Sequence, residues 1–243
     1  MTGRVSSLAR WPERGSSVSF ATWLGEMANL VAVTVSPPPY PTDAARGDGQ
    51  PVIVVPGFCS PNVSTIRLRR FLTRQGFAPR TWTCGINVGP APKVLPRLER
   101  QIVETAERTG RPVSLIGMSL GGTLAREAAK RCPQSIARVV TMCSPVRLPV
   151  MTPLAPLAHL AGFLWDDEAR RTMARVSEPP PVPVTAIVSP KDGVLDWRDS
   201  LPERSALVEI VTIEGAHMTI GSNPEAQRIV AARLARMTSK DDG

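Results

Sequence analysis

The sequence is poor in the residue types that many binding sites require. It has two histidines and four cysteines in 243 residues. The cysteines (Cys59, Cys84, Cys132 and Cys143) are far apart and form no CxxC pair, so they predict neither a disulfide scaffold nor a zinc or redox site. We expect buried thiols, with a Cys59–Cys84 bridge as the alternative after two predicted strands. No metal and no cofactor are expected.

Aromatic residues are also scarce, although the chain is basic. Lys and Arg number 29 against 21 Asp and Glu, which gives a formal net charge of +8. A nucleic-acid-binding surface would gather this charge and add aromatic residues for base stacking. Here the basic residues are scattered, with Arg67, Arg69 and Arg70 as the densest group, and aromatic residues make up only 5%. We therefore predict a solvated basic surface and no nucleic-acid partner.

Long apolar runs are missing as well. The apolar segment 21–35 contains Glu26 and Asn29 and is shorter than the roughly 20 residues that a membrane-spanning helix needs. The N-terminus lacks the apolar core of a secretory signal, so we expect a cytoplasmic protein without a transmembrane segment. The segment predicts a helix packed on the domain. A peripheral membrane contact or a place at a substrate entrance are the alternatives.

Short β-branched runs alternate with amphipathic helices after residue 50. The expected strands cover 52–55, 77–83, 113–116, 136–141, 184–188 and 207–213, and the expected helices cover 64–74, 94–108, 120–131 and 224–237. This alternation predicts an α/β fold with a mainly parallel central sheet and helices on both faces. We expect residues 1–50 to form an N-terminal helix and linker, and residues 51–243 to form one domain.

The alternation is interrupted between about 147 and 181. This stretch begins with an apolar, proline-punctuated run that contains LAPLAHLAGFLW and continues through a charged helix to the linker EPPPVP. We expect the insertion to form a small apolar cap over the functional site. Phe163 and Trp165 from the cap, together with Met118, would then line a substrate pocket.

Ser119 lies in a turn between an expected strand and an expected helix. Residues 117–121 read GMSLG and match the pattern G-x-S-x-G in the strand-to-helix context that makes it informative. Such a turn strains the serine backbone and projects its hydroxyl above the sheet. Gly117 and Gly121 are needed where the strand and the helix pass too close for side chains. The pattern predicts Ser119 as a nucleophile, and the alternative is a turn that merely uses small residues.

A serine hydroxyl needs a base, and the two candidates are His159 and His217. His217 follows the expected strand 207–213, which places it at the carboxyl edge of the sheet where the serine turn also opens. His159 lies inside the apolar insertion, where we expect a core or capping role. The sequence therefore predicts His217 as the base.

The base in turn needs an acid that fixes its tautomer and stabilises the imidazolium. Asp192 lies in an Asp-Gly turn after the expected strand 184–188, between the serine and the histidine in chain order. Asp196 and Asp199 are rivals, which we interpret as caps or solvated charges. The prediction is that Asp192 orients His217.

Two backbone N–H groups would have to hold the oxyanion of a tetrahedral intermediate. The N–H of Leu120, directly after the serine, is expected to supply one of them. The second is expected from Phe58 in the turn VVPGFCSP, where Gly57 lets the chain turn closely. The alternative is a simple Pro-Gly turn, and both interpretations are compatible.

With these motifs the chain after residue 50 resembles the bacterial α/β-hydrolases of the esterase, lipase and acyltransferase-like type. The resemblance rests on PGF, GINVGP, PVSLIGMSLGG, SPKDGVLDW and GAHMTIG. It implies the α/β-hydrolase fold, the catalytic residues Ser119, Asp192 and His217, and the oxyanion donors Phe58 and Leu120. One departure is the turn PGF, where many relatives have His-Gly. The departure keeps the backbone donor but prevents transfer of substrate preference.

The expected activity is hydrolysis of carboxylic esters through an acyl-enzyme, without a cofactor. The expected substrates are small-molecule or lipid-like esters with apolar, short-to-medium acyl groups. An amidase, thioesterase or acyltransferase could use the same three residues, because a fold does not fix the chemistry. A non-catalytic binder of apolar ligands is the remaining alternative.

Overall fold

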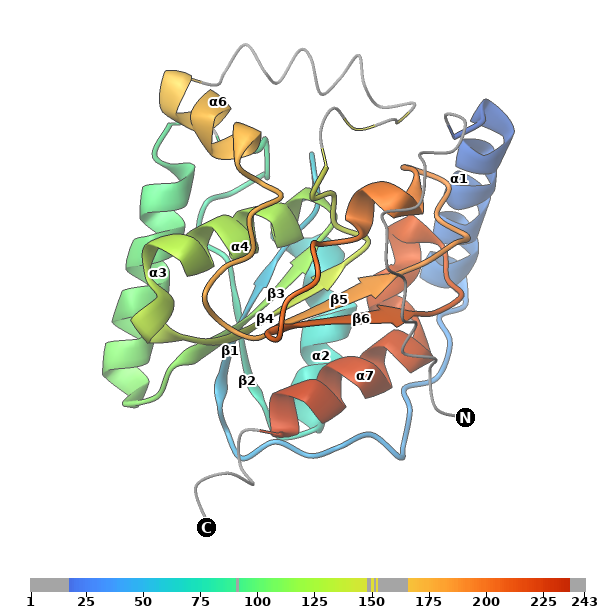
Figure 1. Ribbon diagram of the computed structural model, residues 1–243. Coiled ribbons are helices and arrows are strands. Elements are labelled where there is room, and N and C mark those ends of the chain that lie inside the picture. Colours follow the sequence, from blue (N-terminus) through green and yellow to red (C-terminus); the bar gives the residue numbers. More distant parts are fainter. Residues whose placement is uncertain (1–17, 91, 148–149, 151, 153–165, 237–243) are drawn as a thin grey trace.

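The computed structural model describes residues 18–90, 92–147, 150, 152 and 166–236. They form a six-stranded sheet with helices on both faces (Figure 1). In spatial order the strands are β2 (Ala78–Thr81), β1 (Pro51–Val55), β3 (Val113–Met118), β4 (Ile136–Met142), β5 (Val184–Val188) and β6 (Val208–Thr212). All neighbouring pairs are parallel. The predicted mainly parallel sheet is therefore confirmed.

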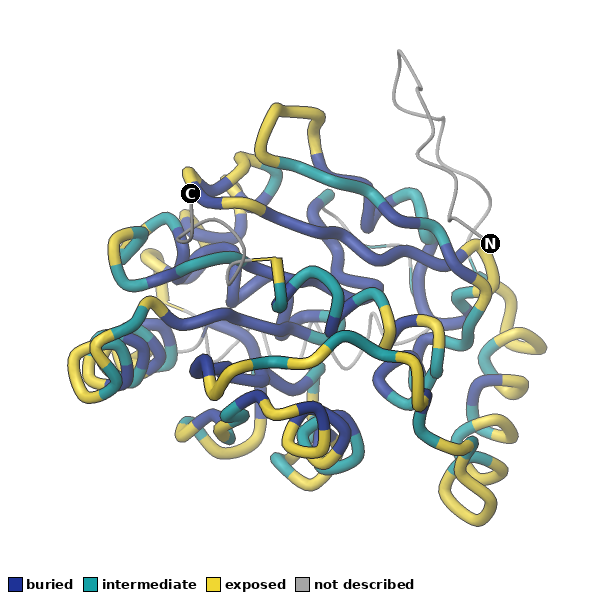
Figure 2. The backbone as a smooth tube through the Cα atoms, turned by 90° about the horizontal axis from the view of Figure 1, so that it is seen from below, coloured by how far each residue is buried: buried dark blue, intermediate teal, exposed yellow. Residues whose placement is uncertain are grey.

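The central strands are buried on both faces, which explains their continuous apolar sequences. All five residues of β1 are buried, and so are all five of β5 (Figure 2). Side chains alternate along a strand. Val52 and Val54 therefore point into one core and Ile53 and Val55 into the other. Complete burial of such a side chain contributes about 1.5–3 kcal/mol.

The two cores lie under different pairs of helices. One core joins the sheet to α2 (Ile66–Arg74) and α7 (Pro224–Ala235), and the other joins it to α3 (Val94–Thr109) and α4 (Leu120–Arg131). Helices on both faces are what a parallel sheet requires. Short 3-10 turns cover Asn62–Thr65, Pro133–Ser135, Trp197–Ser200 and His217–Ser222.

The N-terminal helix α1 (Phe20–Val35) stands at one side of the sheet, next to the loops that follow β5 and β6 (Figure 1). The linker after it packs on the α2 face through Tyr40, whose ring stacks on Phe71 at a centroid distance of 6.0 Å. The expected helix at 21–35 is thus present and packs on the domain. No described helix combines the length and the apolar character needed to cross a membrane.

The expected element boundaries shift by a few residues. The segment 64–74 divides into a 3-10 turn and α2, because Thr65 rather than Ser64 is the residue preceding the α-helix. Strand β2 is shorter than the expected 77–83. In the insertion, the charged helix is α6 (Asp167–Ala174), which begins after the capping residue Asp166. The cap residues His159, Phe163 and Trp165 lie outside the described residues.

Candidate active site

Ser119 lies between β3 and α4 in an unusual backbone conformation. Its φ is 50° and its ψ is −129°, in a region that residues with a side chain rarely adopt. The Ser119 N–H donates to the Met142 carbonyl of β4 at 2.9 Å, and its carbonyl accepts from the Gly122 N–H at 2.9 Å. These bonds hold the serine in the strained turn.

The two glycines of the serine turn are required by close backbone approach. A Cβ atom on Gly117 would lie 2.2 Å from Gly122 Cα, and one on Gly121 would lie 2.3 Å from the Pro56 carbonyl oxygen. These are clashes with backbone atoms, which cannot swing away as a side chain can. The start of α4 therefore fits against β3 and the end of β1 only with glycine at both positions.

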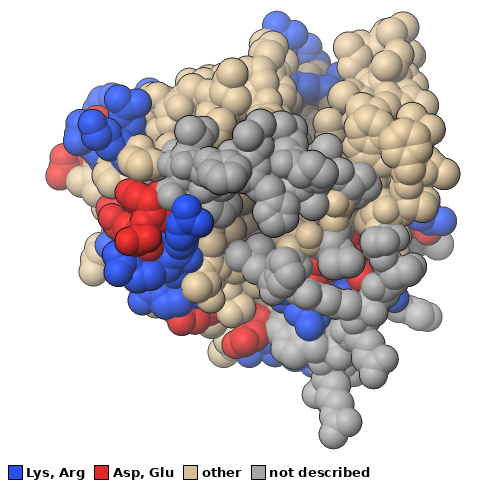
Figure 3. Space-filling model, turned by 90° about the horizontal axis from the view of Figure 1, so that it is seen from above, with Lys and Arg blue, Asp and Glu red and all other residues tan. Residues whose placement is uncertain are grey.

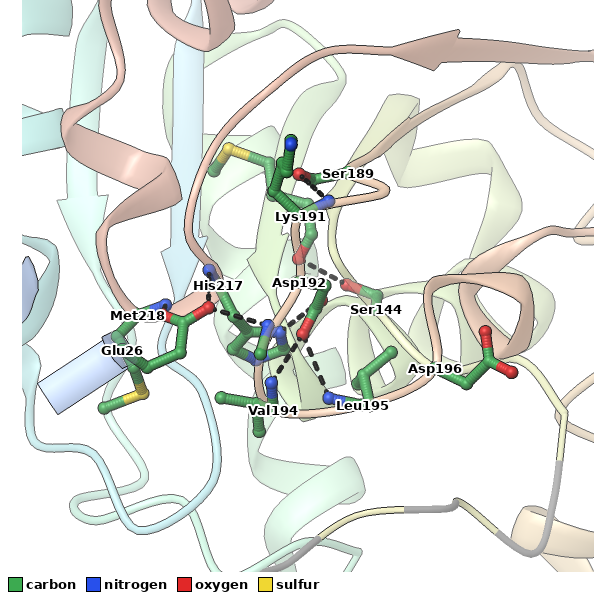
Figure 4. Close-up of polar contacts among 12 residues, drawn as sticks. Glu26, Ser144, Ser189, Lys191, Asp192, Val194, Leu195, Asp196, His217 and Met218 are labelled. Carbon is green, nitrogen blue, oxygen red and sulfur yellow. Dashed lines mark hydrogen bonds and ion pairs between the residues drawn. The ribbon is translucent and has the colours of Figure 1, made fainter. Parts of the chain in front are cut away.

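His217 and Asp192 form a close pair at the carboxyl edge of the sheet (Figure 4). His217 Nδ1 lies 2.6 Å from Asp192 Oδ2. Asp192 Oδ1 accepts from the N–H groups of Val194 at 2.9 Å and Leu195 at 3.0 Å. The side chains of His217 and Asp192 are only 5% and 1% exposed. The carboxylate is thus fixed by its own turn and aligned with the imidazole ring.

The charge around His217 favours its protonated form. Burial alone lowers the pKa of an imidazole, because it penalises the charged form. The negative charge of Asp192, its hydrogen bond to the ring and the charge of Glu26 outweigh burial, so the pKa of His217 lies above its ordinary value. An imidazolium formed during a reaction would be stabilised here.

The rival carboxylates have other roles in the structure. Asp196 caps the turn Trp197–Ser200 by accepting from the Arg198 N–H at 3.0 Å, and it also pairs with the Arg198 guanidinium at 3.2 Å. In Figure 4 its side chain points away from His217. Asp199 is completely buried, so the expectation of a solvated charge is wrong for this residue. Its place inside a capped turn next to the sheet explains the burial.

The turn that contains Phe58 approaches the serine from β1. A Cβ atom on Gly57 would lie 3.4 Å from Ser119 Cβ, so the two turns are in contact. The N–H of Phe58 donates to no carbonyl in the described part of the chain. The N–H of Leu120 begins α4, where the first turn has no carbonyl partner within the helix. Both groups predicted as oxyanion donors are therefore free of helix and strand hydrogen bonds.

Asn87 fixes the Phe58 turn and was not identified from the sequence. It is completely buried, and its Nδ2 donates to the Pro56 carbonyl at 2.7 Å. The Asn87 backbone carbonyl accepts from the Cys59 N–H at 2.7 Å. The motif GINVGP pointed to this loop, and the amide within it was the available signal.

A cavity of about 630 Å³ brings these groups together. Ser119, His217, Phe58 and Met118 all line it, as do residues of α1 and α2. Such a volume lies within the range of about 300–1,000 Å³ that is usual for ligand sites. Among the described contacts no hydrogen bond joins Ser119 to His217, although both side chains face the same cavity.

Glu26 of α1 is a second site residue that the sequence did not reveal. Its side chain reaches the His217 loop from the N-terminal helix (Figure 4). Residue 26 is only 2% exposed, although it lies on a surface helix. The available signal was a single charged residue in an otherwise uncharged helix.

One group of described residues has the geometry of a metal site. The potential ligand atoms of Cys143, Asp192 and His217 lie within 4.8 Å of one another. Burial, with the nearby charges of Asp192 and Glu26, raises the pKa of the Cys143 thiol well above its ordinary value, which disfavours the thiolate that a metal needs. His217 Nδ1 and Asp192 Oδ2 are already hydrogen-bonded to each other, so neither atom is available to a metal. The donor set therefore fits a hydrogen-bonded pair better than a metal.

The cysteines form no disulfide. All four are free, and only Cys59 is exposed. The alternative Cys59–Cys84 bridge is thus not formed in this structure.

Comparison with known proteins assigns the chain to a family. A family model described as the alpha/beta hydrolase family matches residues 52–239. The chain belongs to the alpha/beta hydrolase family. No curated protein matches this hydrolase by sequence.

Several solved structures are similar to this hydrolase. The monoacylglycerol lipase of Paleococcus ferrophilus has a TM-score of 0.55 at 18% identity, over 77% of this chain and 96% of the lipase. An alpha/beta hydrolase from a sediment metagenome of the Mar Chica lagoon has a TM-score of 0.55 at 17% identity, over 79% and 93%. The pyrethroid hydrolase PytH has a TM-score of 0.54 at 15% identity, over 79% and 99%. At these identities the likeness shows the fold alone.

Proposed function

We propose that the protein is a carboxylic-ester hydrolase in which Ser119 is the nucleophile, His217 the general base and Asp192 the acid that orients it. The observation that carries the proposal is the bonded Asp192–His217 pair, at 2.6 Å, beside a serine held at φ 50° on the same cavity. The fold and its glycine-bounded turn support the same assignment.

The reaction proceeds in two halves. Ser119 Oγ attacks the ester carbonyl carbon while His217 Nε2 takes the hydroxyl proton, and His217 then returns the proton to the departing alcohol. Water enters, gives its proton to His217 and attacks the acyl-enzyme. The carboxylic acid leaves and Ser119 regains its proton. Asp192 stabilises the imidazolium in both halves, in accordance with the raised pKa of His217.

The negative charge on the tetrahedral intermediate is held by backbone groups. The N–H of Leu120 and the N–H of Phe58 are the proposed donors, and Asn87 holds the Phe58 turn in place. The structure records no hydrogen bond between the described side chains of Ser119 and His217. This is compatible with catalysis, because such bonds often form or tighten only when substrate binds.

We propose that the substrate's acyl group is short to medium in length and lies against the apolar part of the cavity wall. This part of the wall includes Leu30 and Val33 from α1, Val63, and Met118 beside the serine. These side chains offer apolar contact, and a buried methylene group contributes about 0.8 kcal/mol. We therefore propose apolar acyl esters as substrates.

A panel of p-nitrophenyl esters from acetate to laurate, with a matched anilide and a thioester, tests the reaction class. We expect hydrolysis to be faster with one of the esters than with the anilide or the thioester, and we expect Ser119→Ala to lose this activity. A fluorophosphonate should add once, at Ser119, and stop hydrolysis. Ser205→Ala, at an exposed serine of the turn before β6, is the control and should keep full activity. An adduct elsewhere, or a fully active Ser119→Ala, would show that the assignment is wrong.

A further inference from the structure

The charge pattern of α1 is the reverse of that of an ordinary surface helix. Its sequence, FATWLGEMANLVAVTV, contains one charged residue, Glu26, and that residue is the buried one. The surface over α1, the lobe at the right of Figure 3, is mainly uncharged. Burying a carboxylate is unfavourable unless hydrogen bonds replace its water. The position of Glu26 therefore requires a specific set of partners.

Those partners are backbone N–H groups on two separate loops. Glu26 Oε1 accepts from the Gly193 N–H at 2.8 Å and from the His217 N–H at 2.7 Å. Glu26 Oε2 accepts from the Met218 N–H at 2.9 Å. Gly193 directly follows Asp192, so one carboxylate is bonded both to the residue after the acid and to the base itself.

The fit between α1 and the acid loop is close. A Cβ atom on Gly193 would lie 2.7 Å from Glu26 Cγ and 2.8 Å from the Thr22 carbonyl oxygen. A glycine is therefore required for α1 to approach this loop. A second contact, from Thr219 Oγ1 to Asn29 Oδ1 at 2.6 Å, ties the same helix to the turn after His217.

We propose that Glu26 is a positioning residue of the hydrolase, which fixes the Asp192 loop and the His217 loop relative to each other. The inference rests on the proposed function. The two loops follow different strands, β5 and β6, and the Asp192–His217 bond forms only if both loops are held at the right separation. Glu26 connects them by three hydrogen bonds and is the residue through which α1 holds both loops.

The charge of Glu26 has a further effect on the base. Among the described residues, Asp192 from the loop after β5, Glu26 from α1 and Cys143 directly after β4 lie close to His217. Arg67 and Arg70 of α2 line the same cavity. The Glu26 charge contributes to the raised pKa of His217. Removal of this charge should therefore shift the acid limb, which is the fall of activity at low pH, to lower pH. Loss of a merely structural anchor would leave it where it is.

Glu26→Gln is the principal test, because it keeps the shape and removes the charge. We expect kcat to fall by about 10- to 100-fold, since small misplacements of catalytic groups have effects of this size. KM should stay within about threefold, and the acid limb should move to lower pH. Asn29→Ala is the control, because it removes the other contact of α1 with the His217 turn. It should lower Tm while kcat and the acid limb stay at their wild-type values.

A folded Glu26→Gln with wild-type kcat and an unchanged acid limb would overturn the proposal. If this variant does not fold, Gly193→Ala replaces it, since the added Cβ pushes Glu26 and α1 away from the acid loop while Glu26 itself is unchanged. A fall in kcat then supports the proposal, and a wild-type kcat overturns it. Wild-type protein that neither hydrolyses esters nor reacts with a fluorophosphonate would instead refute the proposed function.

Discussion

The packing of the surrounding residues maintains the strained backbone conformation of Ser119. A positive φ at a residue with a side chain costs about 1–3 kcal/mol. The hydrogen bond from Ser119 to β4 and the tight fit of Gly117 and Gly121 offset this cost by leaving the turn no other arrangement. The strain places the hydroxyl at the cavity, and the glycines are the residues on which the turn depends.

A pair of glycine substitutions tests this dependence. Gly117→Ala introduces a Cβ 2.2 Å from Gly122 Cα and should lower the free energy of unfolding by about 2–3 kcal/mol. Gly25→Ala, on the exposed face of α1, meets no atom within 4 Å and should raise it by about 0.5–1 kcal/mol. Urea denaturation of both variants gives the comparison. Equal effects would show that backbone crowding at Gly117 is not the deciding factor.

The raised pKa of His217 determines how activity depends on pH. A general base must be neutral, so kcat/KM should fall as the pH drops through the pKa of His217, at a pH above the ordinary imidazole value of 6.5. Asp192→Asn removes a negative charge, so the acid limb should move to lower pH. The rate should also drop by roughly 10⁴-fold, as when the acid of a serine protease is replaced.

Asp196→Asn is the matched control for this pH experiment. It alters a capping carboxylate four positions further along the chain, so the acid limb should stay where it is in the wild type. If the fall of activity at low pH shifts in Asp196→Asn and not in Asp192→Asn, the acid has been assigned to the wrong residue here.

At the level of elements, the strands and helices could be predicted because local patterns determine them. Strands β1, β4 and β5 are short buried runs rich in β-branched residues, and α3 has a clear apolar face. Glu26 and Asn87 were missed for a physical reason. Their partners lie far away in the chain, 191 residues for Glu26 and His217, and no local pattern records such a contact.

The turn before Phe58 illustrates how one element supports another. Asn87→Ala should remove the hydrogen bond from its side chain to the Pro56 carbonyl, so the Phe58 turn would be held less firmly. We expect kcat to fall by about 10- to 100-fold while KM changes little, because the donor acts mainly on the transition state. Asn62→Ala, whose amide bonds the Trp82 carbonyl, is the control and should leave kcat unaltered. Steady-state kinetics with the preferred ester measures both, and an unchanged kcat in Asn87→Ala would contradict the role.

For the molecule as a whole, the excess positive charge extends into the cavity. Arg67 and Arg70 line it, and the part of its lining that the structure describes includes no Asp or Glu. The Arg67 guanidinium lies over the Tyr40 ring at 4.6 Å, and its Nη2 donates to the Pro38 carbonyl. A cavity lined in this way attracts anionic groups, and salt weakens the attraction.

An ester with a negatively charged acyl end tests this electrostatic effect. Mono-p-nitrophenyl adipate should have a higher kcat/KM than p-nitrophenyl hexanoate at low ionic strength, by about fivefold, and the advantage should shrink with added salt. Arg67→Gln should reduce the advantage. Arg80→Gln, at an exposed position of β2 outside the cavity, changes net charge equally and should not. A preference for hexanoate in the wild type would contradict the prediction.

The contact of Glu26 with His217 also concerns the order in which the chain is made. Glu26 leaves the ribosome before Ser119, and His217 emerges last of the three, 191 residues after its partner. A nascent chain can therefore display the serine turn long before it has an oriented base. On the proposed mechanism, hydrolysis begins only when the His217 loop packs against α1. A nascent chain that ends between Ser119 and His217 therefore carries the nucleophile but remains inert.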